Sequence, residues 1–261
     1  MNDILTNNLN VKLIFLGNGG GRTIIATNFT STGGFVISYN QKLLVCEPGI
    51  QSFDNFHKMK LDIKAIDGII VSHNHLDHVH DLTRYLEACD FLAKKKPFLL
   101  ASRNVLVGDN RYDKYLSSYH AKKAEYIVGE ANNEYQIGDF KIRTTKIKHD
   151  EYTGFGFVVH VGTKKIGYTS DSEFFKGFAE QFNNCDCLIV NNLKPENDGI
   201  PDHLCTNDTI ELLKIAKPKM VILYHLGMSM FKKGVKSEIE KIEKETKIDV
   251  LAAEPCMIVD V

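Results

Sequence analysis

Four side chains that can bind metal ions lie within six residues of one another. They are His73, His75, Asp77 and His78. His73 and His75 point the same way if the segment is extended, and Asp77 and His78 lie where a helix is expected to begin and can reach a second ion. Neutral imidazole suits Zn²⁺, and also Fe or Mn. The segment could be an ordinary solvated polar loop, but three histidines and an aspartate at this spacing favour a metal site.

Two ions about 3.5–4 Å apart can hold a bridging hydroxide and bind the oxygens of a displacement reaction. Such a site needs roughly seven protein ligands, so the cluster predicts further ligands elsewhere. The sequence offers His149, Asp171 and His225, each soon after a predicted strand. Asp171 suits the bridging position because its two carboxylate oxygens can serve two ions. His149 or His225 alone would be interpreted as an ordinary histidine, and the cluster raises the expectation for both.

The elements that must position these residues are short apolar strands alternating with helices. Strands are expected at 11–16, 34–38, 42–46, 67–71, 98–101, 135–137, 140–147, 155–161, 165–169, 187–190, 220–224, 250–253 and 257–261. Helices are expected at 78–93, 206–216 and 236–246, the second capped by Thr206 or Asn207. The pattern predicts an α/β fold of two packed sheets covered by helices, with residues 1–261 as one domain.

Composition narrows the class of protein. The 261 residues carry a formal net charge of −1, so the chain as a whole is not a typical nucleic-acid binder. Six cysteines in a chain of this length are expected to be reduced. Residues 1–8 do not resemble a secretory signal, and no run approaches the roughly 20 apolar residues of a membrane span. A cytoplasmic protein without a membrane partner is expected.

The cluster and the three later residues resemble the metallo-β-lactamase superfamily. Its His-x-His-x-Asp-His signature matches residues 73–78, and its later His, Asp and His match His149, Asp171 and His225 in order. The resemblance runs from about Leu13 to the C-terminus. It implies a four-layer αβ/βα sandwich with the site at one edge, between two sheets.

The same resemblance implies a distribution of ligands. One ion would be held by His73, His75, His149 and Asp171, and the other by Asp77, His78, His225 and Asp171. Asp77 is also expected to act as a general base or to orient the nucleophile. Di-iron oxygen-reducing members have Glu where this chain has His75, which favours hydrolysis over redox chemistry.

Two further motifs look like those of tRNase Z and related phosphodiesterases. In the glycine-rich segments 16–21 and 32–34, the backbone amides of Gly19, Gly20, Gly33 and Gly34 could approach a phosphate. Tight turns that need positive φ explain these glycines equally well. Residues 202–206 are similar to an additional histidine motif of this branch. There His203 would protonate the leaving oxygen or stabilise phosphoryl charge, unless it is an ordinary histidine before a helix.

Two departures from that branch weigh against tRNA as the substrate without excluding it. We find no long arm of Gly, Pro and basic residues, and the chain is too short for the extra β-CASP domain. Residues 91–125 contain eight basic and three acidic residues, a net charge of +5, with interleaved tyrosines. They could bind an anionic substrate, but we favour a solvated face. Residues 102–133 are the candidate lid or partner surface.

The sequence therefore predicts a dinuclear metal-dependent hydrolase, foremost a phosphodiesterase in which a metal-bridged hydroxide attacks phosphorus. The expected cofactors are two divalent ions, Zn²⁺ first, with Mn or Fe as alternatives. The expected partners are a phosphodiester-containing small molecule or RNA as substrate, and a second copy of the chain in a homodimer. The enzymatic alternative is hydrolysis of a thioester, lactone or lactam. The non-enzymatic alternative is a nucleic-acid-binding or scaffold protein with a vestigial site.

Overall fold

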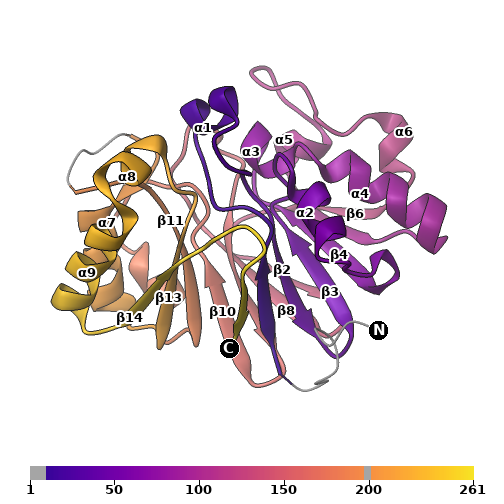
Figure 1. Ribbon diagram of the computed structural model, residues 1–261. Coiled ribbons are helices and arrows are strands. Elements are labelled where there is room, and N and C mark those ends of the chain that lie inside the picture. Colours follow the sequence, from indigo (N-terminus) through magenta and orange to yellow (C-terminus); the bar gives the residue numbers. More distant parts are fainter. Residues whose placement is uncertain (1–9, 197–200) are drawn as a thin grey trace.

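Two β-sheets pack face to face, and helices cover the outer face of each (Figure 1). The computed structural model describes residues 10–196 and 201–261, so residues 1–8, examined above for a secretory signal, lie outside it. The first sheet has the order β15 (Ile258–Asp260), β1 (Lys12–Phe15), β2 (Phe35–Tyr39), β3 (Lys42–Cys46), β4 (Ile66–Val71), β5 (Phe98–Ser102), β6 (Glu125–Gly129). This four-layer arrangement is the sandwich predicted from the sequence.

The second sheet carries the later strands. Its order is β14 (Asp249–Ala252), β13 (Met220–Tyr224), β11 (Cys187–Lys194), β10 (Lys164–Tyr168), β9 (Gly156–Val161), β8 (Phe140–Thr145), β7 (Glu134–Ile137), with β12 (Leu204–Cys205) beside β11. The antiparallel run β7 to β10 and the hairpin β2–β3 are as predicted.

The helices lie on both outer faces (Figure 1). Those near the first sheet are α2 (Ser52–Lys58), α3 (Leu76–Val79), α4 (Leu82–Ala88), α5 (Arg103–Leu106) and α6 (Ser118–Ala121), with a π-helical segment at Cys89–Ala93 and a 3₁₀ turn at Ile63–Ala65. Those near the second sheet are α7 (Thr206–Ala216), α8 (Met228–Lys233) and α9 (Val235–Thr246), with a 3₁₀ turn at Ala179–Phe182. Helix α1 (Arg22–Thr27) lies at the top of the seam between the halves.

The core has three parts, because each sheet is buried on both faces. Aromatic side chains fill the space between the sheets, among them Phe35, Phe157 and Tyr224. Strand β4 illustrates the consequence, since Ile70 faces this central core while Ile69 faces the helices. A strand buried on both sides needs a continuous apolar run rather than an alternating one.

Strand direction decides where a site can form. Strands β3, β4, β5 and β6 are mutually parallel, as are β10, β11, β13 and β14 in the other sheet. The carboxyl ends of parallel strands meet at one edge, and ligands of α/β proteins gather there. All the predicted ligands follow such ends or the neighbouring ends of antiparallel strands.

Three local predictions were wrong. The helix expected over 78–93 is interrupted at Asp81, because its carboxylate accepts from the Phe53 backbone N–H at 3.0 Å and its own N–H donates to Pro48 at 2.8 Å. Residues 125–129 form β6, although no strand was expected between 101 and 135. Helix α7 is capped by Cys205, whose N–H donates to Asp208 Oδ2 at 3.0 Å, and not by Thr206 or Asn207.

Within residues 10–196 and 201–261, no helix combines the length and apolar character needed to traverse a lipid bilayer.

Candidate metal centre

The strand ends around the site carry residues in an unusual backbone conformation. Glu47, Ser170 and His225 follow β3, β10 and β13, and their φ angles are 55°, 57° and 55°. This left-handed region is unfavourable for side chains other than glycine, so tertiary contacts must hold these residues in place. Such strain is common at functional sites.

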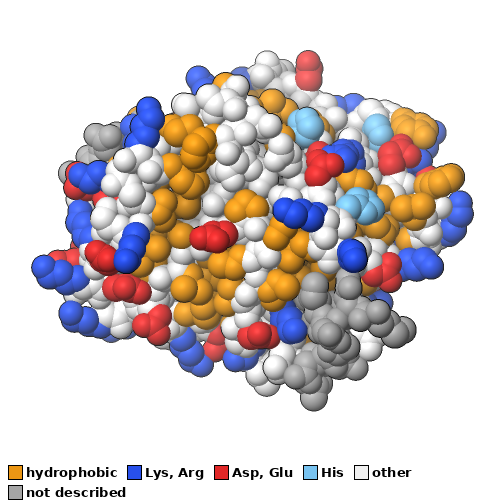
Figure 2. Space-filling model, viewed as in Figure 1, with side chains coloured by type: hydrophobic (Ala, Val, Ile, Leu, Met, Phe, Trp, Pro, Cys, Tyr) orange, Lys and Arg blue, Asp and Glu red, His pale blue; other side chains and the backbone are white. Residues whose placement is uncertain are grey.

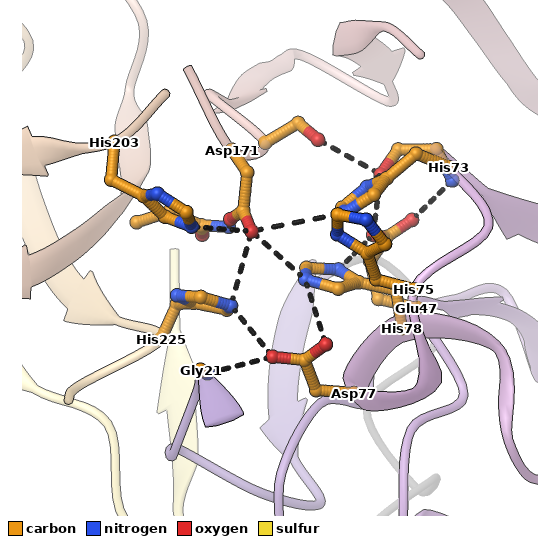
Figure 3. A network of polar contacts seen from close by, with 12 residues as sticks. Gly21, Glu47, His73, His75, Asp77, His78, Asp171, His203 and His225 are labelled. Carbon is orange, nitrogen blue, oxygen red and sulfur yellow. Dashed lines mark hydrogen bonds and ion pairs between the residues drawn. The ribbon is translucent and has the colours of Figure 1, made fainter. Parts of the chain in front are cut away.

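The Asp171 carboxylate lies at the centre of the cluster, surrounded by imidazoles (Figure 3). Its Oδ2 atom lies 3.2 Å from His203 Nε2, 3.3 Å from both His78 Nε2 and His225 Nε2, and 3.8 Å from His73 Nε2. Its other oxygen, Oδ1, accepts a hydrogen bond from Asn191 Nδ2 at 2.7 Å. The sequence suggested that each carboxylate oxygen would serve one ion. In the structure only Oδ2 faces both groups of histidines, because Asn191 engages Oδ1.

Four overlapping groups of side chains could each hold an ion. Glu47, His73 and His78 form one, and Asp171, His203 and His225 form another; the remaining two consist of predicted ligands alone. The first ligand group is His73, His75, His149 and Asp171, and the second is Asp77, His78 and His225. In each group, one ligand atom per residue lies within 4.8 Å of the others. In the first, His149 Nε2 lies 3.2 Å from His75 Nδ1, and in the second, His225 Nε2 lies 3.1 Å from Asp77 Oδ2. The structure thus brings together all seven predicted ligands.

The residues of both groups fit divalent ions. The Nε2 atoms of His73 and His78 are buried and have no hydrogen-bond partner among the described residues. Burying a polar atom without a partner is costly, and a metal ion would satisfy a lone pair on each nitrogen. Imidazole and carboxylate together are the ligand chemistry of zinc, manganese and iron sites.

Four of the pKa shifts agree with this interpretation, whereas the Asp171 and Asp77 carboxylates outweigh burial and raise the pKa of His78. Burial lowers the pKa of His73 and of His149, which keeps both imidazoles in the neutral form that binds metal. Burial alone would raise the pKa of Asp77 and Asp171. The neighbouring histidines outweigh it, His78 first for Asp77 and His225 first for Asp171, and both pKa values fall below the ordinary range. Both carboxyl groups are therefore ionised at neutral pH.

Glu47 supports the cluster, and sequence reasoning did not identify it. Its side chain is fully buried, and its Oε2 atom lies 2.6 Å from His78 Nδ1 and accepts from Ser72 Oγ at 2.6 Å. A carboxylate only accepts, so His78 Nδ1 donates and Nε2 is left free for an ion. Ser72 Oγ is in turn 2.9 Å from His73 Nδ1. The available signal was an acidic residue directly after the buried strand Lys42–Cys46.

A buried chain of hydrogen bonds joins the two sheets behind the ligands. Asn191 Nδ2 donates to Asp171 and also to Tyr168 Oη at 3.0 Å, and Tyr168 Oη donates to Glu47 Oε2 at 3.3 Å. Ser170 Oγ donates to Ser72 Oγ at 2.8 Å. The orientation of Asp171 is thereby coupled to that of His78.

His203 lies beside both ligand groups at the edge of the cavity. Its side chain is 17% exposed, and its ring packs 5.1 Å from that of His149 and 5.8 Å from that of His225. Burial would lower the pKa of His203, but the nearby Asp171 carboxylate raises it more, so the pKa lies above its usual value. The Asp171 carboxylate therefore favours the protonated form of the His203 imidazole.

The predicted glycines are placed differently from one another. Gly20 lines the cavity, and the position of a Cβ there would lie 2.3 Å from the His225 ring. Gly19, Gly33 and Gly34 are not among the residues that line it. Gly33 donates its N–H to the Asp77 carbonyl at 3.1 Å, and a Cβ would meet that oxygen at 2.2 Å. Its amide therefore supports the ligand loop instead of facing a phosphate. Gly21 was missed, and its N–H donates to Asp77 Oδ2 at 2.8 Å.

The cluster opens into a cavity of about 760 Å³. Its walls come from residues 20–25, the ligand loop 75–77, residues 149–150, Asp171, residues 193–194, residues 201–203 and residues 227–229. None of the lining residues belongs to 102–133, the segment predicted as a lid or partner surface; the segments around α1 and α8 border the opening. The volume falls in the range typical of small-molecule sites, roughly 300–1,000 Å³.

The sequence of this chain is similar to those of known proteins. Residues 43–226 match the family model described as a beta-lactamase superfamily domain. A protein of Methanocaldococcus jannaschii described as uncharacterized is 33% identical over 249 residues, which cover 94% of this chain and 93% of that protein.

Solved structures share the fold at lower identity. The metallo-β-lactamase fold protein YhfI of Bacillus subtilis has a TM-score of 0.80 at 19% identity, covering 97% of this chain and 100% of that one. A diphosphatase of the PhnP family has a TM-score of 0.72 at 15% identity, covering 97% of each chain. The short form of human tRNase Z has a TM-score of 0.68 at 15% identity, covering 95% of this chain and 98% of that one.

Proposed function

Because this chain belongs to the metallo-β-lactamase superfamily of metal-dependent hydrolases, we propose that it is a dinuclear metal-dependent phosphodiesterase. The observation that carries the proposal is His203. The seven predicted ligands account for both ion sites without it, yet it lies 3.2 Å from Asp171 Oδ2 and lines the cavity. A histidine in that position, with a raised pKa, is suited to protonate a leaving alkoxide oxygen.

The proposed ions would be held by His73, His75, His149 and Asp171 on one side, and by Asp77, His78, His225 and Asp171 on the other. When bound, divalent ions supply Lewis acidity and lower the pKa of water toward neutrality. Zn²⁺ is the first candidate because imidazole and carboxylate ligands suit it, with Mn or Fe as alternatives.

The chain's own residues would contribute positioning and proton transfer. Asn191 holds the Asp171 carboxylate so that Oδ2 faces the cavity side of the cluster. Gly21 fixes Asp77 through its backbone N–H, which leaves Asp77 Oδ1 free to orient a nucleophile. His203 would give its Nε2 proton to the leaving oxygen and would then be a neutral imidazole.

Similar structures support phosphate esters as the substrate class. The fold neighbours include proteins described as a diphosphatase, as tRNase Z and as yeast PDE1. These likenesses concern the fold, so the choice of a phosphodiester for this chain depends on His203 and on the cavity.

Hydrolysis of bis(p-nitrophenyl) phosphate by protein loaded with Zn²⁺ or Mn²⁺ tests the proposal. With a dinucleoside monophosphate, whose leaving group is an alkoxide, we expect His203→Ala to lower kcat about 10²–10⁴-fold, the usual contribution of a general acid, while bound metal stays unchanged. With bis(p-nitrophenyl) phosphate the loss should be much smaller, because nitrophenolate leaves without a proton. His75→Ala should lose both metal and turnover. His160→Ala, a change of an exposed histidine on β9, is the matched control and should retain both.

The outcomes separate the alternatives. Loss of metal in His203→Ala would make His203 a ligand rather than a proton donor. Absence of turnover in protein that carries about two ions per chain would overturn the phosphodiesterase proposal and favour the thioester, lactone and lactam substrates.

A further inference from the structure

We propose that Arg22 and Lys194 form a second anion-binding site in the catalytic cavity, and that the substrate is a small phosphodiester carrying an additional phosphate group. The inference rests on the proposed function, because it takes the hydrolysed group to be a diester. It adds a specificity site outside the ligand groups.

The backbone positions of both basic residues lie next to the metal centre. Arg22 directly follows Gly21, whose N–H donates to Asp77 Oδ2 at 2.8 Å. Lys194 directly follows Leu193, and the position of a Cβ on Gly21 would lie 3.1 Å from Leu193 Cδ1. The start of α1 and the end of β11 are therefore in contact, and both Arg22 and Lys194 line the cavity.

The charge of the cavity differs between its walls. Asp150 and Asp202 lie on the wall that carries His149: Asp150 Oδ1 is 3.2 Å from His149 Nε2, and the Asp202 carbonyl is 3.0 Å from His149 Nδ1. Arg22 and Lys194 lie on the wall formed by α1 and β11. An elongated ligand with one anionic end would be oriented by this difference, with that end toward α1.

Neither basic side chain has an ion-pair or hydrogen-bond partner among the described residues, whereas nearby Lys233 pairs with Glu196 at 3.2 Å. Unpaired guanidinium and ammonium groups that face a shared cavity suit a phosphate. Arg supplies a planar pair of donors and Lys a point charge. Apolar walls from Ile25, Leu76 and Met228 would contact the carbon skeleton between the two charged groups.

The surroundings favour a small substrate over a nucleic-acid strand. A polynucleotide would need a basic track to follow its backbone. On the face seen in Figure 2, Lys and Arg side chains are interspersed with Asp and Glu rather than gathered in a band. The net charge of −1 and the cavity of about 760 Å³ agree with a small molecule.

Binding of two matched nucleotides to the Zn²⁺-loaded protein tests the inference. Thymidine 3′,5′-bisphosphate and thymidine 5′-monophosphate differ only in the second phosphate. We expect calorimetry to give at least about tenfold tighter binding of the bisphosphate, the effect of one charge-assisted contact. Arg22→Gln and Lys194→Gln should each reduce this ratio, and the double variant should bring it close to one. Lys58→Gln, which removes one exposed charge on α2, should keep the ratio.

Equal affinities in the unchanged protein, or a ratio that survives the double variant, would overturn the inference. Tighter binding of a single-stranded oligonucleotide than of the bisphosphate would overturn the assignment to a small substrate. Bis(p-nitrophenyl) phosphate has no second anionic group, so its turnover tests the proposed function alone. A ratio that depends on Arg22 and Lys194 without any diester turnover would reject the function and keep the anion site. Diester turnover without a ratio that depends on these two residues would keep the proposed function and reject the anion site.

Discussion

Glu47 illustrates how one residue determines the chemistry of its neighbours. Its carboxylate accepts from Ser72 N and Ser72 Oγ and contacts His78 Nδ1, all in a fully buried setting. An outer carboxylate of this kind fixes the tautomer and the ring orientation of a ligating histidine. Both effects depend on the negative charge and on two accepting oxygens.

We predict that Glu47→Gln weakens Zn²⁺ binding about 10–100-fold, the usual effect of losing such a partner. The amide nitrogen cannot accept, so at least one of the four contacts, with Ser72 N, Ser72 Oγ, His78 Nδ1 and Tyr168 Oη, must break. Competition with a chromogenic chelator measures the affinity. Glu125→Gln, on the exposed side of β6, makes the same chemical change and should leave affinity intact. Unchanged affinity in Glu47→Gln would show that the ligands hold their geometry without the carboxylate.

The residues of the centre differ in how well sequence reveals them. Residues 73–78 stand out because their ligand atoms come from one short segment with recognisable spacing. Asn191, Tyr168 and Glu47 act through contacts 20 to 121 positions apart in the chain, and no local pattern encodes such contacts. His203 was identified only through a family motif, and its contact with Asp171 became evident from the structure.

At the scale of elements, the loop before α1 packs directly on His225, the residue that follows β13. The approach is so close that only glycine fits at position 20, where a Cβ would lie 2.3 Å from three atoms of the His225 ring. His225 itself has φ of 55°, so it has little freedom to adjust.

We predict that Gly20→Ala displaces His225 and disrupts the second ligand group, so that bound metal falls from about two ions per chain to about one. Metal analysis after gel filtration measures the stoichiometry. Gly177→Ala introduces the same methyl group where no atom lies within 4 Å, at φ of 89°, and should keep both ions despite its backbone strain. Two ions retained in Gly20→Ala would mean that the α1 loop gives way instead of the histidine.

A second contact between segments ties two loops together near His75. Tyr152 Oη donates to Asp109 Oδ2 at 2.6 Å, and the Asp109 loop carries Tyr112, whose ring lies 6.4 Å from that of His75. The Tyr152 hydrogen bond, helped by the backbone N–H groups of Arg111 and Tyr112, lowers the pKa of Asp109 to about 2.

The lowered pKa fixes the pH range in which this contact stabilises the fold. It contributes fully above the ordinary carboxyl pKa of about 3.9 and is lost as pH falls through about 2. We predict that Tyr152→Phe moves the pKa of Asp109 back toward its ordinary value, measured by NMR titration of the carboxyl carbon. Tyr126→Phe, on the exposed edge strand, should not move it. A pKa that stays near 2 in Tyr152→Phe would assign the shift to the backbone donors.

Element prediction was most direct where burial is two-sided. Strands β4 and β13 are continuous apolar runs with turns at both ends, which the sequence displays directly. Strand β6 was missed because Glu125, Tyr126 and Ile127 are all exposed, so neither a buried run nor alternation marks it. The break in the 78–93 helix depends on Asp81 contacting Phe53 and Pro48, residues outside the segment.

For the molecule as a whole, the two ligand groups span both sheets. His73 and His75 belong to the first half of the chain, and His149 and Asp171 to the second; Asp77 and His78 meet His225 in the same way. Bound ions would therefore stabilise the packing of one sheet on the other, because they bind only the folded arrangement.

We predict that removal of metal with a chelator lowers the thermal unfolding midpoint by roughly 8 °C or more. Free metal at about 1,000 times its Kd stabilises the folded state by about 4 kcal/mol, and each kcal/mol shifts the midpoint of a protein of this size by about 2–4 °C. Calorimetry of the two forms measures the shift. Re-addition of Zn²⁺ serves as the control and should restore the midpoint. A midpoint independent of metal would indicate that the packed sheets hold the ligands unaided.

The division of each ligand group between the halves also bears on how the protein is made. As the chain leaves the ribosome, residues 73–78 emerge early, but the first ligand group is incomplete until Asp171 has emerged, and the second until His225. A nascent chain, or a fragment released by premature termination, therefore lacks a complete pair of ion sites. Both ligand groups can therefore be complete only when nearly all of the chain has been synthesised and its two halves have packed together.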